Sequence, residues 1–214
     1  MTDKALFITL EGIDGSGKST QAKRIAQWLE DFTGRRTICT FEPGGWEGGK
    51  TLREFILGSK SYNALSELLL FLADRSEHVE KIIMPALNSG HNIICERYND
   101  STLAYQSGGH NLEIAHVKRI ITACNFPEPD AKILLDLTPE IALERMKSRK
   151  NINDKFENDK FESEGLALMK NVAKFYKDSS ENFIAVNCDK LSEHEVFNEI
   201  ISRLEAMIKQ CQSR

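Results

Sequence analysis

The stretch GIDGSGKST, residues 12–20, decides the fold. Four of its positions fill the pattern G-x-x-x-x-G-K-[ST], namely Gly12, Gly17, Lys18 and Ser19. In this pattern the backbone N–H groups of a loop and of the following helix N-terminus surround phosphate oxygens. An apolar run, ALFITL at 5–10, precedes the loop, and apolar residues at helical spacing follow it. A strand, loop and helix in this order predict a phosphate-binding loop rather than a glycine-rich turn without a ligand.

The loop predicts an ATP site with a metal ion. We expect Lys18 to reach the β and γ phosphates and the Ser19 hydroxyl to ligate Mg²⁺. A GTPase would need an Asn-Lys-x-Asp string, and the nearest candidate, NCDKL at 187–191, has the wrong order. We predict that ATP contacts the whole loop, which consists of Gly12, Ile13, Asp14, Gly15, Ser16, Gly17, Lys18, Ser19 and Thr20.

Further apolar runs predict four more strands, at 36–41, 92–95, 131–137 and 182–186. Their hydrophobicity is continuous rather than alternating, which indicates strands covered on both faces. Patterns with helical spacing lie between them. We therefore predict an α/β protein with a three-layer P-loop NTPase fold, in which helices flank a five-stranded parallel sheet. A chain of 214 residues is most simply one domain, 1–214.

The composition argues against several classes of protein. A net charge of −4 argues against a general nucleic-acid-binding protein. The five cysteines are odd in number and include no C-x-x-C pair, which favours reduced thiols. No signal peptide opens the sequence, and no apolar run approaches the roughly 18 residues of a membrane span. We expect a cytoplasmic protein that binds neither nucleic acid nor membrane.

A second phosphate site is predicted after the run at 92–95. Glu96 and Arg97 follow that strand, so they should lie at the same sheet edge as the phosphate-binding loop. A carboxylate there can hold Mg²⁺, and a guanidinium can bind a second phosphate through two hydrogen bonds. A surface ion pair is the alternative. Asp136 competes for the metal, but we favour Glu96 because Asp136 can serve the turn into the helix that begins after Thr138.

Phe71 and Arg75 stand at i and i+4 of one predicted helix. A flat aromatic ring beside a guanidinium group suits a nucleobase, because the ring can stack on the base and the guanidinium N–H groups can form hydrogen bonds with its edge. The alternative is a core phenylalanine beside a solvated arginine.

Together these stretches resemble the bacterial type of thymidylate kinase, within the P-loop nucleoside monophosphate kinases. The resemblance rests on EGIDGSGKST at 11–20, EPGG at 42–45, FLADR at 71–75, DSTLAYQ at 100–106 and LLDLTPEIALER at 134–145. It implies an enzyme that phosphorylates dTMP to dTDP with ATP and Mg²⁺, for dTTP synthesis. It also implies a homodimer.

The resemblance implies roles for the matched residues. Asp14 would lie near the dTMP sugar, and Arg53 and Arg97 would bind its phosphate. Phe71 would stack on thymine, and Arg75 would lie near a thymine carbonyl. The rest of the implied substrate site is Glu42, Pro43, Ser101, Tyr105 and Gln106. The expected catalytic residues are Lys18, Arg97 and Arg149, and the expected metal ligands are Ser19 and Glu96.

Three residues near the acceptor depart from the family's pattern. Phe41 replaces Arg, Trp46 replaces Thr, and Glu96 replaces Asp. The changes at Trp46 and Glu96 also resemble deoxynucleoside kinases, and they keep open an enzyme that phosphorylates the 5'-hydroxyl of a nucleoside. Such an enzyme would use Glu42 as the base that removes the hydroxyl proton.

The cations favour a monophosphate acceptor. Its second pKa lies near ~6, so it is mostly dianionic at pH 7 and needs positive charge rather than a base. Arg53 and Arg97 beside Lys18 would supply that charge. A protein that only binds ATP is the alternative from another class, and it would leave the nucleobase pocket without a task.

The repeat NDKFENDKFE, residues 153–162, lies in a polar segment that we predict to be a lid, at about 147–165. The first copy resembles a five-residue insertion, which a surface loop tolerates at a small cost in closure entropy. Gly15 stands where the eukaryotic-like relatives carry a basic residue, so the lid should supply that charge. Arg149 is the first candidate, because its planar fork matches phosphate oxygens, and Lys150, Lys155 and Lys160 are the others.

Overall fold

The computed structural model describes residues 4–58, 62–150 and 165–212. Its centre is a parallel sheet with the strand order β2-β3-β1-β4-β5. The strands are β1 (Phe7–Glu11), β2 (Thr37–Phe41), β3 (Asn92–Glu96), β4 (Ala131–Asp136) and β5 (Ile184–Asn187). The predicted five-stranded parallel sheet is confirmed, and the strand bounds differ from the predicted ones by two residues or fewer.

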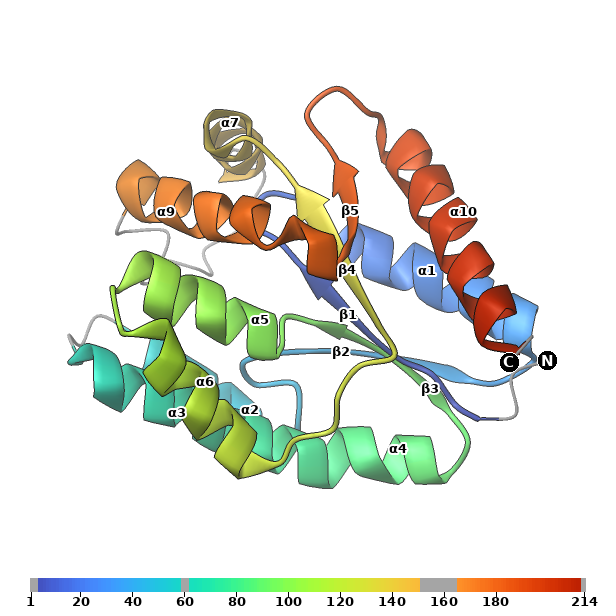
Figure 1. The fold of residues 1–214 in the computed structure, drawn as a ribbon, viewed down its shortest axis with the longest axis horizontal. Helices are drawn as coiled ribbons and strands as arrows, with labels where there is room; N and C mark the ends of the chain where they lie inside the picture. Colours follow the sequence, from blue (N-terminus) through green and yellow to red (C-terminus); the bar gives the residue numbers. More distant parts are fainter. Residues whose placement is uncertain (1–3, 59–61, 151–164, 213–214) are drawn as a thin grey trace.

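Helices cover both faces of the sheet. Figure 1 shows α1 and α10 on one side and α3, α4 and α6 on the other, so the three predicted layers are present. The α-helices are α1 (Lys18–Thr33), α2 (Gly49–Leu57), α3 (Ala64–His78), α4 (Met84–Asn88), α5 (Asn99–Thr102), α6 (Ile114–Cys124), α7 (Pro139–Lys150), α9 (Gly165–Asp178) and α10 (Glu193–Gln212). The described residues also form three short helical segments: η1 (Val79–Ile83), η2 (Leu103–Gly109) and η3 (Ser180–Asn182).

The central strand β1 explains why hydrophobicity is continuous in this sequence. All five of its residues are buried, because β3 and β4 pair with its edges and helices cover its faces. The predicted apolar stripe of α1 is buried too, at Ala22, Ile25, Ala26 and Leu29. The largest cluster of the core forms where this stripe meets the sheet.

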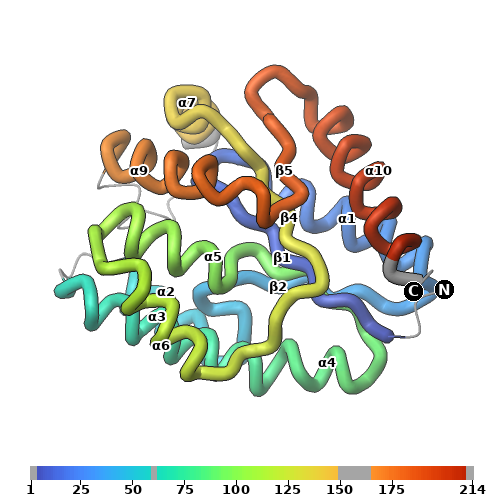
Figure 2. The backbone as a smooth tube through the Cα atoms, in the orientation of Figure 1, coloured from blue at the N-terminus to red at the C-terminus, as the bar shows by residue number. Residues whose placement is uncertain are grey.

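The register of the sheet positions the site. Leu10 of β1 pairs with Glu96 of β3, and Phe41 of β2 pairs with Glu96 from the other side. Figure 2 follows the chain as it leaves β1, β2 and β3 on the same side of the sheet. Carboxyl ends of parallel strands share one edge, so the loops after these three strands meet there.

The starts of two helices test local sequence signals. At the start of α10, the Ser192 hydroxyl accepts from the Glu195 N–H at 3.3 Å and Glu195 Oε2 accepts from the Ser192 N–H at 2.8 Å, which is a capping box. At the start of α7, Asp136 does not cap the turn as we expected. Asp189 does so instead, because its carboxylate accepts from both the N–H and the hydroxyl of Thr138, each at 2.7 Å.

Two segments have π-helical geometry, η1 and η2. Turns of this kind are rare and occur frequently at functional sites. The second one, η2, carries Tyr105 and Gln106, two of the expected substrate residues. The repeat at 153–162 and most of the predicted lid lie outside the described residues.

Candidate functional site

The phosphate-binding loop connects β1 to α1. Gly12 has φ 139° and Gly15 has φ 79°, a region that disfavours side chains. A Cβ on Gly12 would lie 2.7 Å from the Leu135 carbonyl oxygen, and one on Gly15 would lie 2.8 Å from that of Ala142. Helix α1 begins at Lys18, directly after the loop, so its first N–H groups face the same space.

Lys18 lies at the centre of this loop and is 7% exposed. Its Nζ donates to the carbonyl oxygens of Gly12, at 3.1 Å, and Ile13, at 2.9 Å. Burial, and then the positive charge of Arg97, lower the pKa of Lys18 to about 8. A bound phosphate would oppose both effects, so the loop is a site that favours an anion.

Ser19 and Glu96 are brought together by the sheet register. The Ser19 hydroxyl donates to Glu96 Oε2 at 2.7 Å. Asp136 ends the neighbouring strand β4, and burial together with the charge of Asp189 raises the pKa of Asp136. A hydroxyl and a carboxylate at contact distance are oxygen ligands of the kind that Mg²⁺ prefers. The geometry therefore favours Glu96 over Asp136 as the carboxylate that holds a metal beside Ser19.

Arg97 connects the phosphate-binding loop to η2. Its φ is 67°, which turns the side chain back toward the loop at the end of β3. Nη1 donates to the Gly12 carbonyl and to the Ser101 hydroxyl, each at 3.3 Å, and Nη2 donates to Asp14 and to Tyr105 Oη, the latter at 3.1 Å. A guanidinium in this position lies between the loop and the expected acceptor pocket.

Asp14 carries a negative charge beside these cations. Burial alone would raise the pKa of Asp14, but the charges of Arg97 and Lys18 outweigh burial and lower it. The Asp14 carboxylate therefore stays ionised and orients Arg97.

Glu11 is a functional residue that we did not predict. It is the last residue of β1 and is fully buried, and Oε2 accepts from the Ser101 hydroxyl at 2.5 Å and from Tyr176 Oη at 2.9 Å. Oε1 accepts from the Tyr98 N–H at 2.9 Å. Burial, and then the charge of Asp100, raise the pKa of Glu11 to about 7. A carboxylate at the end of an otherwise apolar strand was the signal in the sequence.

Arg75 lies on the other side of the expected pocket and is only 2% exposed. Its Nε donates to Glu42 Oε2 at 2.7 Å, and Nη1 donates to the side chains of Asn99, at 3.1 Å, and Thr102, at 2.9 Å. The alternative of a solvated arginine is therefore wrong. Phe71, one turn earlier in α3, packs against the edge of the core.

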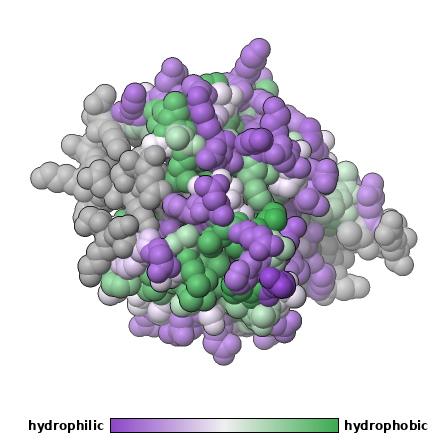
Figure 3. Space-filling view, turned by 60° about the vertical axis from the view of Figure 1, so that its left-hand side comes forward, coloured by the Kyte–Doolittle hydropathy of each residue, from purple (hydrophilic) through white to green (hydrophobic). Residues whose placement is uncertain are grey.

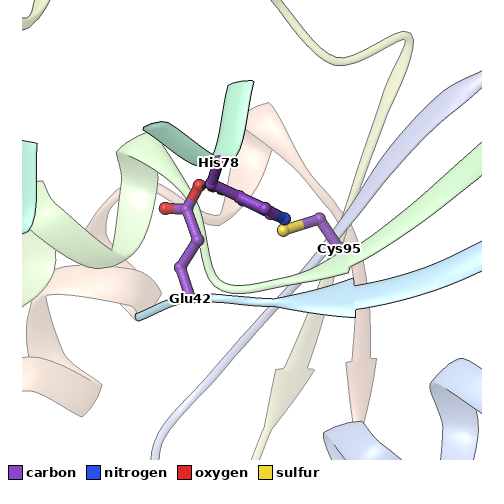
Figure 4. Close-up of side chains that lie close together, drawn as sticks. All are labelled: Glu42, His78 and Cys95. Carbon is purple, nitrogen blue, oxygen red and sulfur yellow. Dashed lines mark hydrogen bonds and ion pairs between the residues drawn. The ribbon is translucent and has the colours of Figure 1, made fainter. Parts of the chain in front are cut away.

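Glu42, His78 and Cys95 form a buried cluster whose ligand atoms all lie within 4.8 Å of one another (Figure 4). Such a set can in principle bind a metal ion. Here Glu42 is already paired with the Arg75 guanidinium, and burial raises the pKa of the Cys95 thiol well above its usual range. A metal ion here would be a second cation beside Arg75, and its binding would need a Cys95 thiolate that is buried away from water. Both are unfavourable, so we interpret the cluster as a hydrogen-bond network.

The loop after β2 is fixed by Asp74 of α3. The Asp74 carboxylate accepts from the Gly44 N–H at 3.0 Å and from the Trp46 indole N–H at 2.9 Å. The ammonium group of Lys81 lies 4.3 Å from the centre of the Trp46 ring. Trp46 is therefore held against α3 and η1. Arg53 of α2 donates to the Pro43 carbonyl of the same loop at 3.0 Å.

Gln106 is buried in η2, and neither its amide nitrogen nor its amide oxygen has a hydrogen-bond partner among the described residues. Buried polar atoms without a partner cost free energy unless a ligand or water satisfies them. The unpaired amide makes Gln106 a candidate contact for a polar ligand beside η2.

A phosphate-binding loop at a helix N-terminus, facing an arginine-lined pocket, defines an enzyme of the P-loop phosphotransferase class. Comparison with known families is more specific. The family model described as "Thymidylate kinase" matches residues 10–200. The chain belongs to the thymidylate kinase family.

Individual relatives agree with this assignment. The chain is 36% identical over 214 residues to a thymidylate kinase of Maridesulfovibrio salexigens, covering 95% of this chain and 97% of that protein. It is 43% identical over 158 residues to one of Synechococcus sp. (strain JA-2-3B'a(2-13)), covering 73% of this chain and 74% of that protein. Its fold is similar to the crystal structure of thymidylate kinase from Ehrlichia chaffeensis, with a TM-score of 0.71, 27% identity, and coverage of 94% of this chain and 99% of that chain.

Hydrogen bonds bring Arg97 together with Asp14, Ser101 and Tyr105, and Arg75 together with Glu42. The side chain of Arg149, at the end of α7, lies outside what the structure describes. Within the described ranges, no helix combines the length and the hydrophobicity that crossing a bilayer requires.

The raised pKa of Glu11 predicts how stability changes with pH. Its pKa rises from 4.5 to about 7 on folding, so between these values the folded state binds more protons than the unfolded state. The contribution of Glu11 to the free energy of unfolding is fully present below pH 4.5 and is lost as the pH rises to about 7. Glu11→Gln removes the titration. From pH 5 to pH 8 the stability of the variant relative to the native protein should rise, by roughly 2 kcal/mol.

Urea unfolding of both proteins at pH 5, 6, 7 and 8 measures this difference. Subtracting one curve from the other removes the contributions of all groups that titrate alike in both proteins. If the difference in the free energy of unfolding between the two proteins stays constant from pH 5 to pH 8, the raised pKa of Glu11 is contradicted.

Proposed function

We propose that this enzyme transfers the γ-phosphoryl group of ATP to dTMP, with Mg²⁺, and so forms dTDP for dTTP synthesis. The observation that carries the proposal is the position of Arg97. Its guanidinium bonds Gly12 of the phosphate-binding loop and Tyr105 of η2 at the same time. A cation shared by the donor loop and the acceptor pocket suits the transfer of a phosphoryl group between two phosphates.

The arrangement supports a phosphate acceptor rather than a hydroxyl acceptor. A nucleoside kinase needs a base, and Glu42 was the candidate. Both Glu42 oxygens are bonded, Oε2 by Arg75 at 2.7 Å and Oε1 by the His78 ring at 2.9 Å. A carboxylate held in this way does not serve as a free base, whereas a dTMP dianion needs none.

In this proposal Lys18 and Arg97 stabilise the charge that is shared by the two phosphates during transfer. Arg149, in the last turn of α7, would add a further cation from the lid. The rest of the loop, from Gly12 to Thr20, would hold the ATP phosphates through its N–H groups.

Ser19 and Glu96 would hold Mg²⁺, which neutralises charge on the β and γ phosphates. The fit rests on the 2.7 Å contact between the two side chains, since both oxygens can turn toward one ion. Glu is one methylene longer than Asp, so a contact through water is compatible with this position.

The acceptor pocket would lie between α3 and η2. Phe71 would stack on the thymine ring, Arg75 and Gln106 would bond its edge, and Tyr105 would disfavour a ribose 2'-hydroxyl. Asp14 and Ser101 would contact the sugar end, and Arg53 would join Arg97 on the phosphate, beside Glu42 and Pro43. The unsatisfied amide of Gln106 supports a polar ligand here.

A homodimer is part of the proposal. Figure 3 shows hydrophobic residues gathered in the lower half of the face that it displays, the half in which Figure 1 places α3 and α6. Leu65 and Leu69 of α3 are 46% and 51% exposed, and Ile114 of α6 is 40% exposed. A second copy would cover this apolar surface. Sedimentation equilibrium at micromolar concentration should give twice the 24.2 kDa of the chain, and a monomer mass would contradict the dimer.

Cys39, Cys95, Cys124 and Cys188 are free thiols, which supports the proposed cytoplasmic location.

An acceptor panel tests the function. A coupled assay of ADP formation with dTMP, thymidine, dGMP and no acceptor should give rapid turnover with dTMP alone. Lys18→Ala should reduce that turnover on the order of 10³-fold, because it removes a cation from the transition state. Faster turnover on thymidine would replace the proposal with a nucleoside kinase. Equal ADP formation without acceptor would replace it with an ATPase.

A matched pair of variants tests the metal ligand. Glu96→Gln keeps the size of the side chain and removes its charge, so it should raise the Mg²⁺ concentration for half-maximal turnover about tenfold or more. Asp136→Asn makes the same change at the end of β4 and should shift it by less than about twofold. The opposite ranking in a Mg²⁺ titration would show that Asp136 is the metal ligand.

A further inference from the structure

A chain of buried hydrogen bonds leads from β2 to Arg75. His78 is the last residue of α3, is fully buried, and lies with its Nδ1 atom 2.9 Å from Glu42 Oε1. Its Nε2 atom lies 2.6 Å from the Thr40 hydroxyl. Glu42 in turn accepts from Arg75 Nε through its other oxygen. None of these contacts involves the phosphate-binding loop.

The Thr40 hydroxyl has one proton and lies 2.6 Å from His78 Nε2 but 3.3 Å from the Gly45 carbonyl oxygen. The direction of the bond between His78 and Glu42 follows from the carboxylate, because a carboxylate oxygen accepts and does not donate. Nδ1–H of His78 therefore donates to Glu42 Oε1.

We propose that His78 is a positioning residue for nucleobase specificity. It fixes the Glu42 carboxylate so that Oε2 holds Arg75 in one orientation. The hydrogen bonds of Arg75 to described residues use Nε and Nη1, which leaves Nη2 to donate to a ligand. The ligand group that fits this donor is a carbonyl oxygen on the edge of a pyrimidine. The inference rests on the proposed function, because it needs Arg75 to face the base.

Without His78, Glu42 Oε1 loses its partner inside the protein. A buried carboxylate oxygen then turns to the nearest donor, which is the same guanidinium. The Tyr98 ring, 4.9 Å from the guanidinium carbon, limits where Arg75 can go in response. The guanidinium of Arg75 therefore rotates, and its Nη2 no longer points toward the position of the pyrimidine carbonyl. Phosphate binding should change little, because Lys18 and Arg97 lie at the other end of the pocket.

Two amide substitutions separate the two hydrogen bonds of His78. An asparagine side chain places its NH₂ where the histidine has Nδ1, so His78→Asn keeps the donor to Glu42. Glutamine reaches the place of Nε2, so His78→Gln keeps only the contact with Thr40. His78→Leu keeps neither. Cys95→Ala is the matched control, since it disturbs packing in the same cluster and removes no bond to Glu42.

Steady-state kinetics with dTMP and dCMP read the result. dCMP carries an amino group where dTMP has a carbonyl, so it reports the donor on Arg75. His78→Gln and His78→Leu should raise the KM for dTMP about tenfold and lower the preference for dTMP over dCMP by a similar factor. The KM for ATP should stay unchanged, and kcat should change by less than about threefold. His78→Asn and Cys95→Ala should keep the native preference.

A measurement without turnover separates this inference from the proposed function. In ¹⁵N NMR spectra the Nε–H of Arg75 should exchange slowly with water in the native protein and in His78→Asn. It should exchange at least about tenfold faster in His78→Leu. A native enzyme that ignores dTMP but shows this pattern overturns the function and leaves the positioning intact. Folded His78→Gln and His78→Leu variants with native KM, base preference and exchange overturn the inference.

Discussion

The carboxylate of Glu11 is the interaction on which the rest of the site depends. It ends the central strand and accepts hydrogen bonds from Ser101 of α5 and Tyr176 of α9. These partners lie 90 and 165 positions away in the sequence, so one buried group connects three distant segments. Because the phosphate-binding loop begins at the next residue, the same bonds fix the start of that loop relative to the helix that orients Arg97.

Charge at this edge of the sheet is balanced before any substrate binds. Two buried cations, Lys18 and Arg75, and the partly buried Arg97 lie beside the carboxylates of Asp14 and Glu42. Removing these charges from water is costly, and each pairing recovers only part of that cost. An incoming phosphate therefore meets cations that are already in position. Charged groups that are oriented in advance do not have to reorganise during the reaction. The same balance explains why Asp14 remains ionised although it is partly buried.

The sequence predicted those features that depend on local patterns. Continuous apolar runs revealed the five strands, and the loop motif located the phosphate site because its geometry needs only nine consecutive residues. Contacts across the chain could not be predicted in this way. The carboxylate that caps the start of α7 is Asp189 rather than Asp136. Because β5 pairs with β4, Asp189 lies beside Thr138 although the two residues are 51 positions apart in the sequence. No pattern in the sequence pointed to His78, and only the packing of α3 against β2 showed its contact with Glu42.

The three departures from the family's pattern have a common physical consequence. Phe41 is 43% exposed and lies with its ring 5.8 Å from the Arg53 guanidinium, so this position supports an arginine instead of supplying one. Trp46 bonds Asp74 and thereby fixes the loop that carries Pro43. Glu96 reaches Ser19 with its longer side chain. Phe41 thus supplies no cation where the family's pattern has Arg, so in the proposed function the phosphate of dTMP would be bound by Arg53 and Arg97. Arg53 contacts the Phe41 ring and the Pro43 carbonyl, and Arg97 is held by Asp14 and Tyr105.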